Sequence, residues 1–407
     1  MTTAQPPARR GLILGLLCLA SFAVVFNNLI ITPILPDISD DLHVRVAIAG
    51  LLVTAYAVVG GVAAIFSGPI IDRIGRKPVV VTGMSILTAA TALSAIAPNF
   101  IFLAGSRMMA GLGVACLTPA VFAAVGDYFS YEERGRAMSW VISANTGASI
   151  LGVPAGAFIS GLLSWRWSFG LMAGLSVIFV GLLFSKLPKD SPRQGVHSDG
   201  MRSVPRVLRD LPTSMAIFSN YVSTSYWFVF VTYMGAYFHD EFHVAKWALG
   251  VFTMVMGVGV LIGSNVGGRL SDRVGKRPII LWTSGICAVF ISLVTTLSPH
   301  ILVAVALLLV FSTFSGARFA SAQAVLSEMT PERRGTVMAL NASGQQFGIV
   351  TGSALGGLVL SMVGYAGLGP TSGILALLSL VTYALFVDES RFAPLPVQAE
   401  VELSTGR

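Results

Sequence analysis

The chain has 407 residues, of which 54% are hydrophobic and only 11% are charged. Soluble globular domains contain about 45–50% apolar and about 25% charged residues, so this composition leaves too little polar surface to cover a water-soluble protein. Cys18, Cys116 and Cys287 all lie inside apolar runs and lack metal-ligand spacing. This pattern argues against a disulfide framework and against a metal site. We therefore expect a membrane protein.

Twelve apolar runs are long enough to cross a bilayer, since a spanning helix takes about 20 apolar residues. They cover residues 11–36, 46–67, 79–97, 100–126, 137–163, 168–187, 211–237, 245–267, 278–297, 301–326, 336–363 and 366–387. Such continuous runs exclude an outer-membrane barrel, whose strands alternate over about ten residues. The first run is too long for the apolar core of a signal peptide. The expected fold class is an all-α membrane protein with twelve transmembrane helices.

The basic residues predict an orientation, because Lys and Arg concentrate in cytoplasmic loops. With the N-terminus inside, 21 of the 26 Lys and Arg residues fall in cytoplasmic segments, and only Arg45, Arg166 and Lys246 fall outside. We expect both termini to be cytoplasmic, in a cytoplasmic membrane of the bacterial type. This topology accounts for the net charge of +7, so no nucleic-acid partner is needed.

The second half of the chain repeats the first half at an offset of 200 residues. Gly68–Pro78 matches Gly268–Pro278, and Glu132 matches Glu332 at the same offset. The polar, proline-containing stretch between the halves is typical of a linker. The expected organisation is a six-helix bundle at 1–187, a cytoplasmic linker at 188–210, and a second six-helix bundle with a short cytoplasmic tail at 211–407.

The Gly68–Pro78 loop between spans two and three resembles the signature loop of the major facilitator superfamily, and Gly268–Pro278 is its expected second copy. The resemblance covers essentially the whole chain and is closest to the twelve-helix drug:proton antiporters and sugar-efflux permeases. It implies two pseudo-symmetric bundles that give alternating access to a central site. It also implies a conformational lock, in which Asp72 clamps the bundles together with Arg134 or Arg136 as its loop partner. The expected lock residues are Gly68, Asp72, Arg73, Gly75, Arg76, Arg134, Asp272 and Arg273.

Two arginines lie inside spans, where a charge needs an interior partner. Arg107 in span four resembles the family's second motif, whose arginine is linked to proton movement; it could also be a structural arginine bonded to carbonyls. Arg318 lies near the middle of span ten, and the repeat did not supply it, because the residue 200 positions earlier is Thr118. Since no carboxylate lies mid-membrane, Asp127 or Asp37 at span ends has to carry the proton if protons drive transport; the alternative is coupling through competition between the arginines and the substrate. We assign coupling to Arg107, Asp127 and Arg318.

Polar side chains within the spans are expected to line a cavity between the halves, because buried amides need partners. The candidates are Asn27, Asn28, Tyr56, Asn145, Tyr226, Asn341 and Gln345. Span five also resembles the family's antiporter motif, whose core reads G-P-x-x-G-G, although here the proline is displaced by one place and the last glycine is alanine. The matching residues are Gly147, Gly152, Pro154 and Gly156.

The sequence contains no P-loop, no Ser-His-Asp set and no metal cluster, so we expect neither an enzyme nor a cofactor. The expected function is secondary active export of a small amphiphilic drug, sugar or metabolite, driven by the proton gradient, by a monomer in the lipid bilayer. The lack of a mid-membrane acid disfavours permanently cationic substrates. One alternative is an uptake symporter or uniporter for a small organic anion that uses Arg107 and Arg318. A transporter-like receptor is a second alternative, which the short C-terminal tail does not favour.

Overall fold

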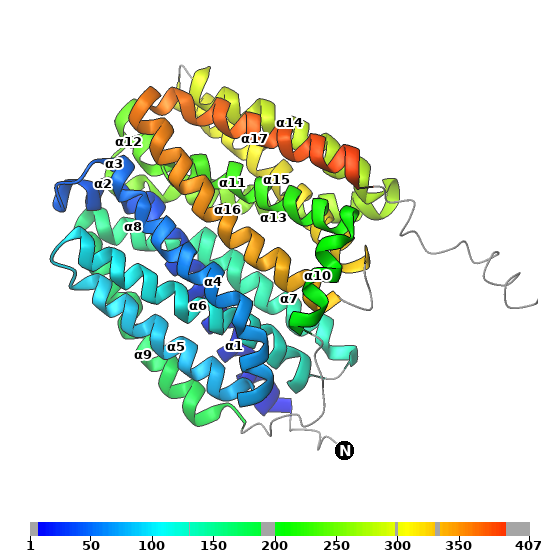
Figure 1. The fold of residues 1–407 in the computed structure, drawn as a ribbon. Coiled ribbons are helices and arrows are strands. Elements are labelled where there is room, and N and C mark those ends of the chain that lie inside the picture. The colour runs from blue at the N-terminus through cyan, green and yellow to red at the C-terminus, as the bar shows by residue number, and fades with distance from the viewer. Residues whose placement is uncertain (1–6, 130, 189–199, 298–299, 330–333, 388–407) are drawn as a thin grey trace, which may run out of the picture.

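A computed structural model of the chain describes residues 7–129, 131–188, 200–297, 300–329 and 334–387. Within these ranges the secondary structure is helical and contains no strand (Figure 1). The first half contains α1 (Pro7–Leu29), α2 (Ile31–Asp41), α3 (Val46–Ala49), α4 (Leu51–Ile74), α5 (Arg76–Ala95), α6 (Phe100–Tyr128), α7 (Tyr131–Gly147), the π-helical turn η1 (Ala148–Gly152), α8 (Val153–Leu162) and α9 (Trp165–Lys186).

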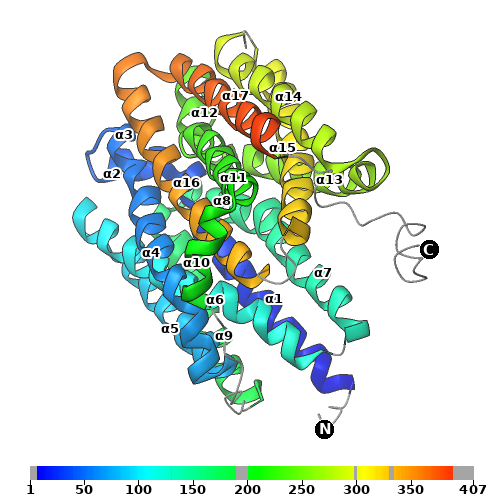
Figure 2. The same cartoon turned by 45° about the vertical axis from the view of Figure 1, so that its right-hand side comes forward.

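The second half begins after the short helix α10 (Gly200–Arg209). It contains α11 (Leu211–Val231), α12 (Met234–Phe242), the 3-10 turn η2 (Lys246–Ala248), α13 (Gly250–Val274), α14 (Lys276–Thr296), α15 (Ile301–Met329), α16 (Arg334–Val363), the 3-10 turn η4 (Tyr365–Gly367) and α17 (Leu368–Phe386). Figure 2 shows α4, α5, α6 and α9 on one side of the molecule and α13, α14, α15 and α17 on the other. The all-α architecture in two halves follows the sequence-based expectation.

Eleven stretches within the described residues are long and apolar enough to cross a membrane. The predicted seventh span, 211–237, is not among these stretches. Its residues form α11 and α12, and the middle of α11 carries Ser219, Asn220 and other polar side chains that lower its mean hydropathy. The seventh span therefore consists of two shorter helices with a break between them.

The first span is broken in the same way, which the continuous apolar run did not predict. α1 ends at Leu29 and α2 begins at Ile31. Pro33 and Pro36 in α2 have no backbone N–H, so each removes one hydrogen bond of a continuous helix. The carbonyl that Pro36 leaves without its helical donor belongs to Thr32, at an i−4 spacing. The chain continues as helix beyond the predicted end of the span, to Asp41.

The two halves meet mainly through α4 with α16, α2 with α12, α3 with α16, α8 and η1 with α13, and α8 and α2 with η2. The pair α2 and α12 lies at one end of the molecule, next to α3 (Figure 1). We call this the closed end. The opposite end carries the basic turns after α4 and α13, and we call it the basic end.

Small residues allow the helices of each half to pack with their backbones in contact, as is common in membranes. α13 lies against α15 in this way: a Cβ atom added to Gly263 would lie 1.7 Å from the carbonyl oxygen of Thr313, and one added to Gly267 would lie 2.3 Å from the Cβ of Ala317. Neither position has room for a side chain. These glycines therefore set the distance between the two helices.

We expect Gly263→Ala to destabilise the protein by roughly 1–3 kcal/mol, because the added methyl group forces α13 and α15 apart. The measurement is the thermal unfolding midpoint in detergent. Gly105→Ala is the matched control. Gly105 lies in another spanning helix, α6, and nothing lies within 4 Å of a Cβ atom added there. Equal midpoints for the two variants would contradict this packing.

Candidate functional site between the two halves

A cavity of about 250 Å³ lies between the halves. It is lined by α1, by α7 and η1, by α11 and by α13, so each half supplies part of the wall. Its lining residues are Val25, Leu29, Asn145, Thr146, Ser149, Trp227, Val231, Thr253, Met256, Gly257 and Val260. All of these residues are uncharged. The wall is thus mainly apolar, with one indole ring and a few hydroxyl and amide groups that can bond a ligand.

Two of the lining side chains are held in place by neighbours. Ser21 Oγ donates a hydrogen bond to Asn145 Oδ1 at 2.6 Å, which fixes the amide against α1. The ring of Trp227 stacks on Phe311, with 5.2 Å between ring centroids and an angle of 25° between the planes. The cavity therefore has a fixed amide on one half and a fixed indole on the other.

The structure places the predicted cavity residues in several environments. Asn145 lines the cavity. Asn27 is buried in the first half, and Tyr226 and Asn341 are buried in the second half. The amide of Asn341 is bonded at both atoms: its Oδ1 accepts from Asn220 Nδ2 and its Nδ2 donates to Gln323 Oε1. The other predicted residues are also absent from the cavity lining: Tyr56 is buried, and Asn28 and Gln345 are half-buried.

The predicted antiporter motif contains the π-helical turn. Val153 N donates to the carbonyl of Ala148, five residues earlier, immediately before Pro154, which cannot donate. Added Cβ atoms would lie 2.5 Å from the Phe22 ring for Gly152 and 2.6 Å from Ile30 Cδ1 for Gly156. The motif therefore packs closely against α1 of its own half, while nothing lies within 4 Å of an added Cβ at Gly147.

The same segment also contacts the second half of the protein, through Pro154 and Ile150. A Cβ atom on Gly250 of α13 would lie 2.6 Å from Pro154 Cα. Likewise, one on Gly257 would lie 2.8 Å from Ile150 Cγ1 in the π turn. The motif thus forms part of the junction between the halves, and Ser149 of the π turn reaches the cavity.

Arg107 is buried in the first half and donates hydrogen bonds to Asn27, which lies two residues before the end of α1. Its Nη2 donates to the backbone carbonyl of Asn27, and its Nη1 lies 3.4 Å from Asn27 Oδ1. The guanidinium lies 5.0 Å from the ring centroid of Tyr56 and 5.8 Å from that of Phe169. A carbonyl, an amide and two aromatic faces thus surround the charge, and they all belong to the first half.

Arg318 is buried in the second half among serine side chains. Its Nε donates to Ser284 Oγ at 2.9 Å, and its Nη2 donates to Ser379 Oγ at 2.7 Å and to Ser219 Oγ at 3.0 Å. These serines belong to α14, α17 and α11, so one guanidinium joins three helices to α15. Neither buried arginine lines the cavity.

Direct contacts hold the closed end together. A Cβ atom on Gly235 of α12 would lie 2.3 Å from the Thr32 carbonyl oxygen of α2, so the two broken spans touch through their backbones. Tyr233 Oη donates to the Ser353 carbonyl at 2.8 Å and lies 3.4 Å from the Ala47 carbonyl of the first half. Trp247 N would lie 2.3 Å from a Cβ atom on Gly161.

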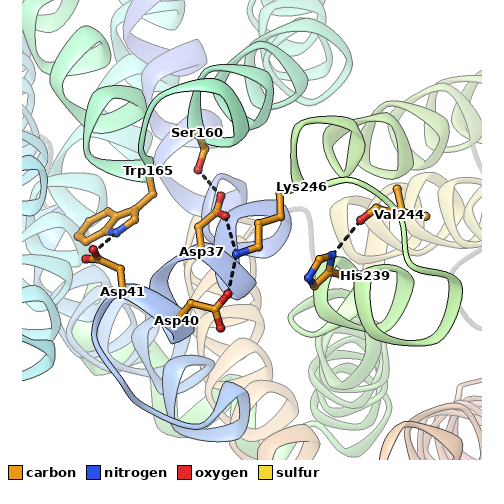
Figure 3. Close-up of polar contacts among 8 residues, drawn as sticks. All are labelled: Asp37, Asp40, Asp41, Ser160, Trp165, His239, Val244 and Lys246. Carbon is orange, nitrogen blue, oxygen red and sulfur yellow. Dashed lines mark hydrogen bonds and ion pairs between the residues drawn. The ribbon is translucent and has the colours of Figure 1, made fainter.

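Polar side chains add to this junction. Thr54 Oγ1 and Ser353 Oγ lie 2.7 Å apart across the halves. Lys246 of η2 reaches two carboxylates of α2: its Nζ lies 2.6 Å from Asp40 Oδ2 and 3.4 Å from Asp37 Oδ1 (Figure 3). Ser160 of α8 donates to the other oxygen of Asp37.

Asp41, one residue after Asp40, is paired within the first half. Its Oδ2 accepts from Arg166 Nη1 at 2.5 Å and from Trp165 Nε1 at 3.1 Å. Partial burial raises the pKa of this carboxyl, but the hydrogen bonds from Arg166 and Trp165, together with the positive charge of Arg166, hold the pKa of Asp41 below its ordinary value. Asp41 is therefore charged at neutral pH, and both of these partners belong to the first half.

A comparison with known protein families gives a direct match. The model of the Major Facilitator Superfamily matches residues 17–312 and 213–404. The chain belongs to this family.

Relatives and solved structures agree with this assignment. An uncharacterized MFS-type transporter of Bacillus subtilis, YwfA, is 27% identical over 372 residues, which cover 90% of this chain and 89% of the relative. Multidrug resistance protein 2 of the same organism is 25% identical over 359 residues and covers 85% of this chain and 88% of its own. A D-xylose–proton symporter structure superposes with a TM-score of 0.78 at 15% identity, covering 95% of this chain and 99% of its own.

The human organic anion transporter MFSD10 superposes with a TM-score of 0.69 at 17% identity, covering 93% of this chain and 100% of its own. These two structural likenesses show the fold. With the family assignment, they make the chain a multi-pass membrane transporter and not an enzyme.

The family's signature loops lie at the basic end. Gly75 and Gly275 have φ angles of 98° and 101°, in the region that favours glycine, so each makes the turn between two spanning helices. Asp272 and Arg273 of the second loop are exposed. In the first loop, Gly68 lies within the continuous helix α4, and the side chains of Asp72 and Arg73 lie outside the described part of the structure.

Asp127, which we had assigned to coupling, lies beside the first signature loop. Its Oδ2 forms an ion pair with Arg76 Nε at 2.9 Å, and Arg76 Nη1 also donates to the carbonyl of Ile71 at 3.0 Å. Arg134 Nη2 donates to the carbonyl of Gly126, one residue before Asp127. Asp127 thus ties the signature loop to the end of α6, far along the helix from Arg107.

Sequence reasoning missed most of the cavity wall. Trp227 stood within an aromatic run on span seven, but an aromatic run does not show which ring faces the centre. Thr146 was expected at the cavity together with Asn145, but Thr253 and Met256, one turn apart on span eight, were not. Their common signal is a position halfway along spans one, five, seven and eight, which becomes visible only once these helices are known to meet.

We expect Arg318→Lys to lower the thermal unfolding midpoint, by roughly 1–3 kcal/mol of stability, because one ammonium cannot bond serines on three helices as the guanidinium fork does. The exposed Arg136→Lys is the matched control and should leave the midpoint unchanged. A fully stable Arg318→Lys variant would contradict the structural role of this side chain.

Proposed function

We propose that this transporter exports a small, uncharged, partly apolar compound from the cytoplasm in exchange for protons. The observation that carries the proposal is the cavity between the halves, whose lining residues are all uncharged. A permanent ion would leave water for this wall without a counter-charge, and such desolvation is costly. A neutral compound could stack on Trp227 and bond the hydroxyl and amide groups nearby.

The proposed direction rests on the charge asymmetry of the two ends. If the basic end faces the cytoplasm, as the distribution of Lys and Arg predicts, the closed end faces outward. The contacts at Gly235, Tyr233 and Thr54 would then seal the outer side. The conformation described here would be the one that takes up cargo from the inside.

The buried arginines support a model in which each half moves as a unit. Arg107 and Arg318 donate only to groups of their own half in the contacts described above. Separation of the halves at the closed end would leave these bonds intact. The contacts between the halves are backbone approaches, single hydrogen bonds and one Lys–Asp group, which can break and re-form more easily.

Two further observations favour export of a drug-like compound over uptake of an organic anion. One relative carries the name Multidrug resistance protein 2. In addition, an anion would need a cation at the cavity wall, and neither Arg107 nor Arg318 lies there. Proton exchange supplies the energy in this proposal, as we expect for the antiporter-like segment from Gly147 to Gly156.

The test is flux into inverted membrane vesicles with an imposed pH gradient, using labelled chloramphenicol, a labelled monosaccharide and a labelled nucleoside as probes. We expect at least one uncharged probe to accumulate and to collapse part of the gradient. Trp227→Ala should weaken apparent affinity about fivefold or more, since a stacked aromatic contact is worth about 1 kcal/mol beyond its buried area.

Trp167→Ala is the matched control, because Trp167 is exposed and is not among the cavity-lining residues. Its flux should equal that of the wild type. Accumulation of a labelled monocarboxylate in right-side-out vesicles, with no flux of the neutral probes, would overturn the proposal.

A further inference from the structure

We propose that Lys246, Asp37 and Asp40 form a proton-operated latch on the closed end. The inference rests on the proposed function in one respect, namely that the two halves separate at this end during transport. In the closed state the ammonium of Lys246 lies between the two carboxylates (Figure 3). Protonation of the carboxylates removes their charge, and with it the attraction that holds η2 to α2.

The three residues come from different halves of the protein, so their contact can respond to the separation of the halves. Asp37 and Asp40 lie one turn apart on α2, which belongs to the first half. Lys246 begins the turn between α12 and α13 in the second half. The contact is formed when the closed end is closed, and it must break when α12 and η2 move away from α2.

The two carboxylates differ in exposure, and this difference ranks their contributions. The side chain of Asp37 is 13% exposed, whereas that of Asp40 is 69% exposed. Exposed ion pairs contribute little because water and salt screen them. Asp37 is screened less, and Ser160 on α8 donates to its second oxygen, so the carboxylate is positioned even when Lys246 leaves.

The other titratable groups around α2 either have partners of their own or, like His43, Glu241 and His243, are exposed. Arg166 on α9 is bonded to Asp41. On α12, His239 Nδ1 lies 2.8 Å from the Val244 carbonyl, and Asp240 accepts from Tyr365. Arg45, which precedes α3, is exposed. α8, which packs on the inner side of α2, carries no titratable side chain.

Linkage gives the sign of the effect. Lys246 stabilises the charged carboxylates only in the closed state, so the open state binds protons more readily. Acid therefore favours opening of the closed end. If this end faces outward, the latch makes outward opening respond to external pH, and it does so without carrying a proton across the membrane.

The experiment measures opening directly, without substrate and without a gradient. Spin labels on Ile96→Cys and Leu297→Cys report the distance between the halves, because both positions are exposed at the ends of α5 and α14 on the closed side. The background carries Cys18→Ala, Cys116→Ala and Cys287→Ser. The protein is held in lipid nanodiscs between about pH 8 and pH 3, a range that extends below the ordinary pKa of an aspartate carboxyl group, about 3.9.

We expect acidification to raise the ratio of long to short distances roughly two- to fivefold in the unmodified latch, the range expected of one partly screened ion pair. In the double variant Asp37→Asn/Asp40→Asn, the ratio of long to short distances at pH 8 should already equal the wild-type ratio in acid. Acidification should not change this ratio. Lys246→Gln should also lose the response. Of the two single variants, Asp37→Asn should have the larger effect.

Asp41→Asn is the matched control, because it removes a neighbouring carboxylate whose partner lies in the same half. It should keep the full pH response. The proposal is overturned if the double variant responds as the wild type does, or if Asp41→Asn loses the response. Since no transport is measured, failure of the vesicle assay would disprove export of the probes and leave this result unaffected.

Discussion

The contact between α2 and α12 is the constraint on which the arrangement of the two halves depends. Both helices are the closed-end segments of broken spans, and both breaks place short helices at the same end of the molecule. Pro36 leaves the Thr32 carbonyl without its helical donor, and Gly235 lets a second backbone approach that carbonyl. The neighbouring contacts of Tyr233, Thr54 and Lys246 surround this point.

The charged groups divide into two kinds according to what they connect. The buried arginines connect helices within one half, where carbonyls, hydroxyls and aromatic rings offset the loss of hydration. Lys246 connects the two halves at a partly exposed site, where a pair is weaker and can be broken at low cost. This division lets each bundle stay rigid while the junction between them changes. It also leaves the cavity wall free of charge, which is the basis for proposing an uncharged cargo.

The sequence was enough to predict the helical fold and its two halves, because long apolar runs and a repeat at constant offset are local signals. It also located Asn145 at the cavity and the two copies of the signature loop, in which Gly75 and Gly275 make the turns. It did not predict the breaks in spans one and seven or the π turn before Pro154, since these depend on how prolines are accommodated by neighbouring helices. The environment of Arg318 could not be predicted either, because its serine partners are 34 to 99 positions away on three helices.

The central claim is that the two halves must separate at the closed end for cargo to cross. The most direct test joins them there. Thr54→Cys and Ser353→Cys, in the cysteine-free background, replace two hydroxyl oxygens that lie 2.7 Å apart across the junction, a spacing that allows a disulfide. We predict that oxidation reduces vesicle flux of the transported probe to background and that a reductant restores it. Undiminished flux through the fully cross-linked protein would contradict the account.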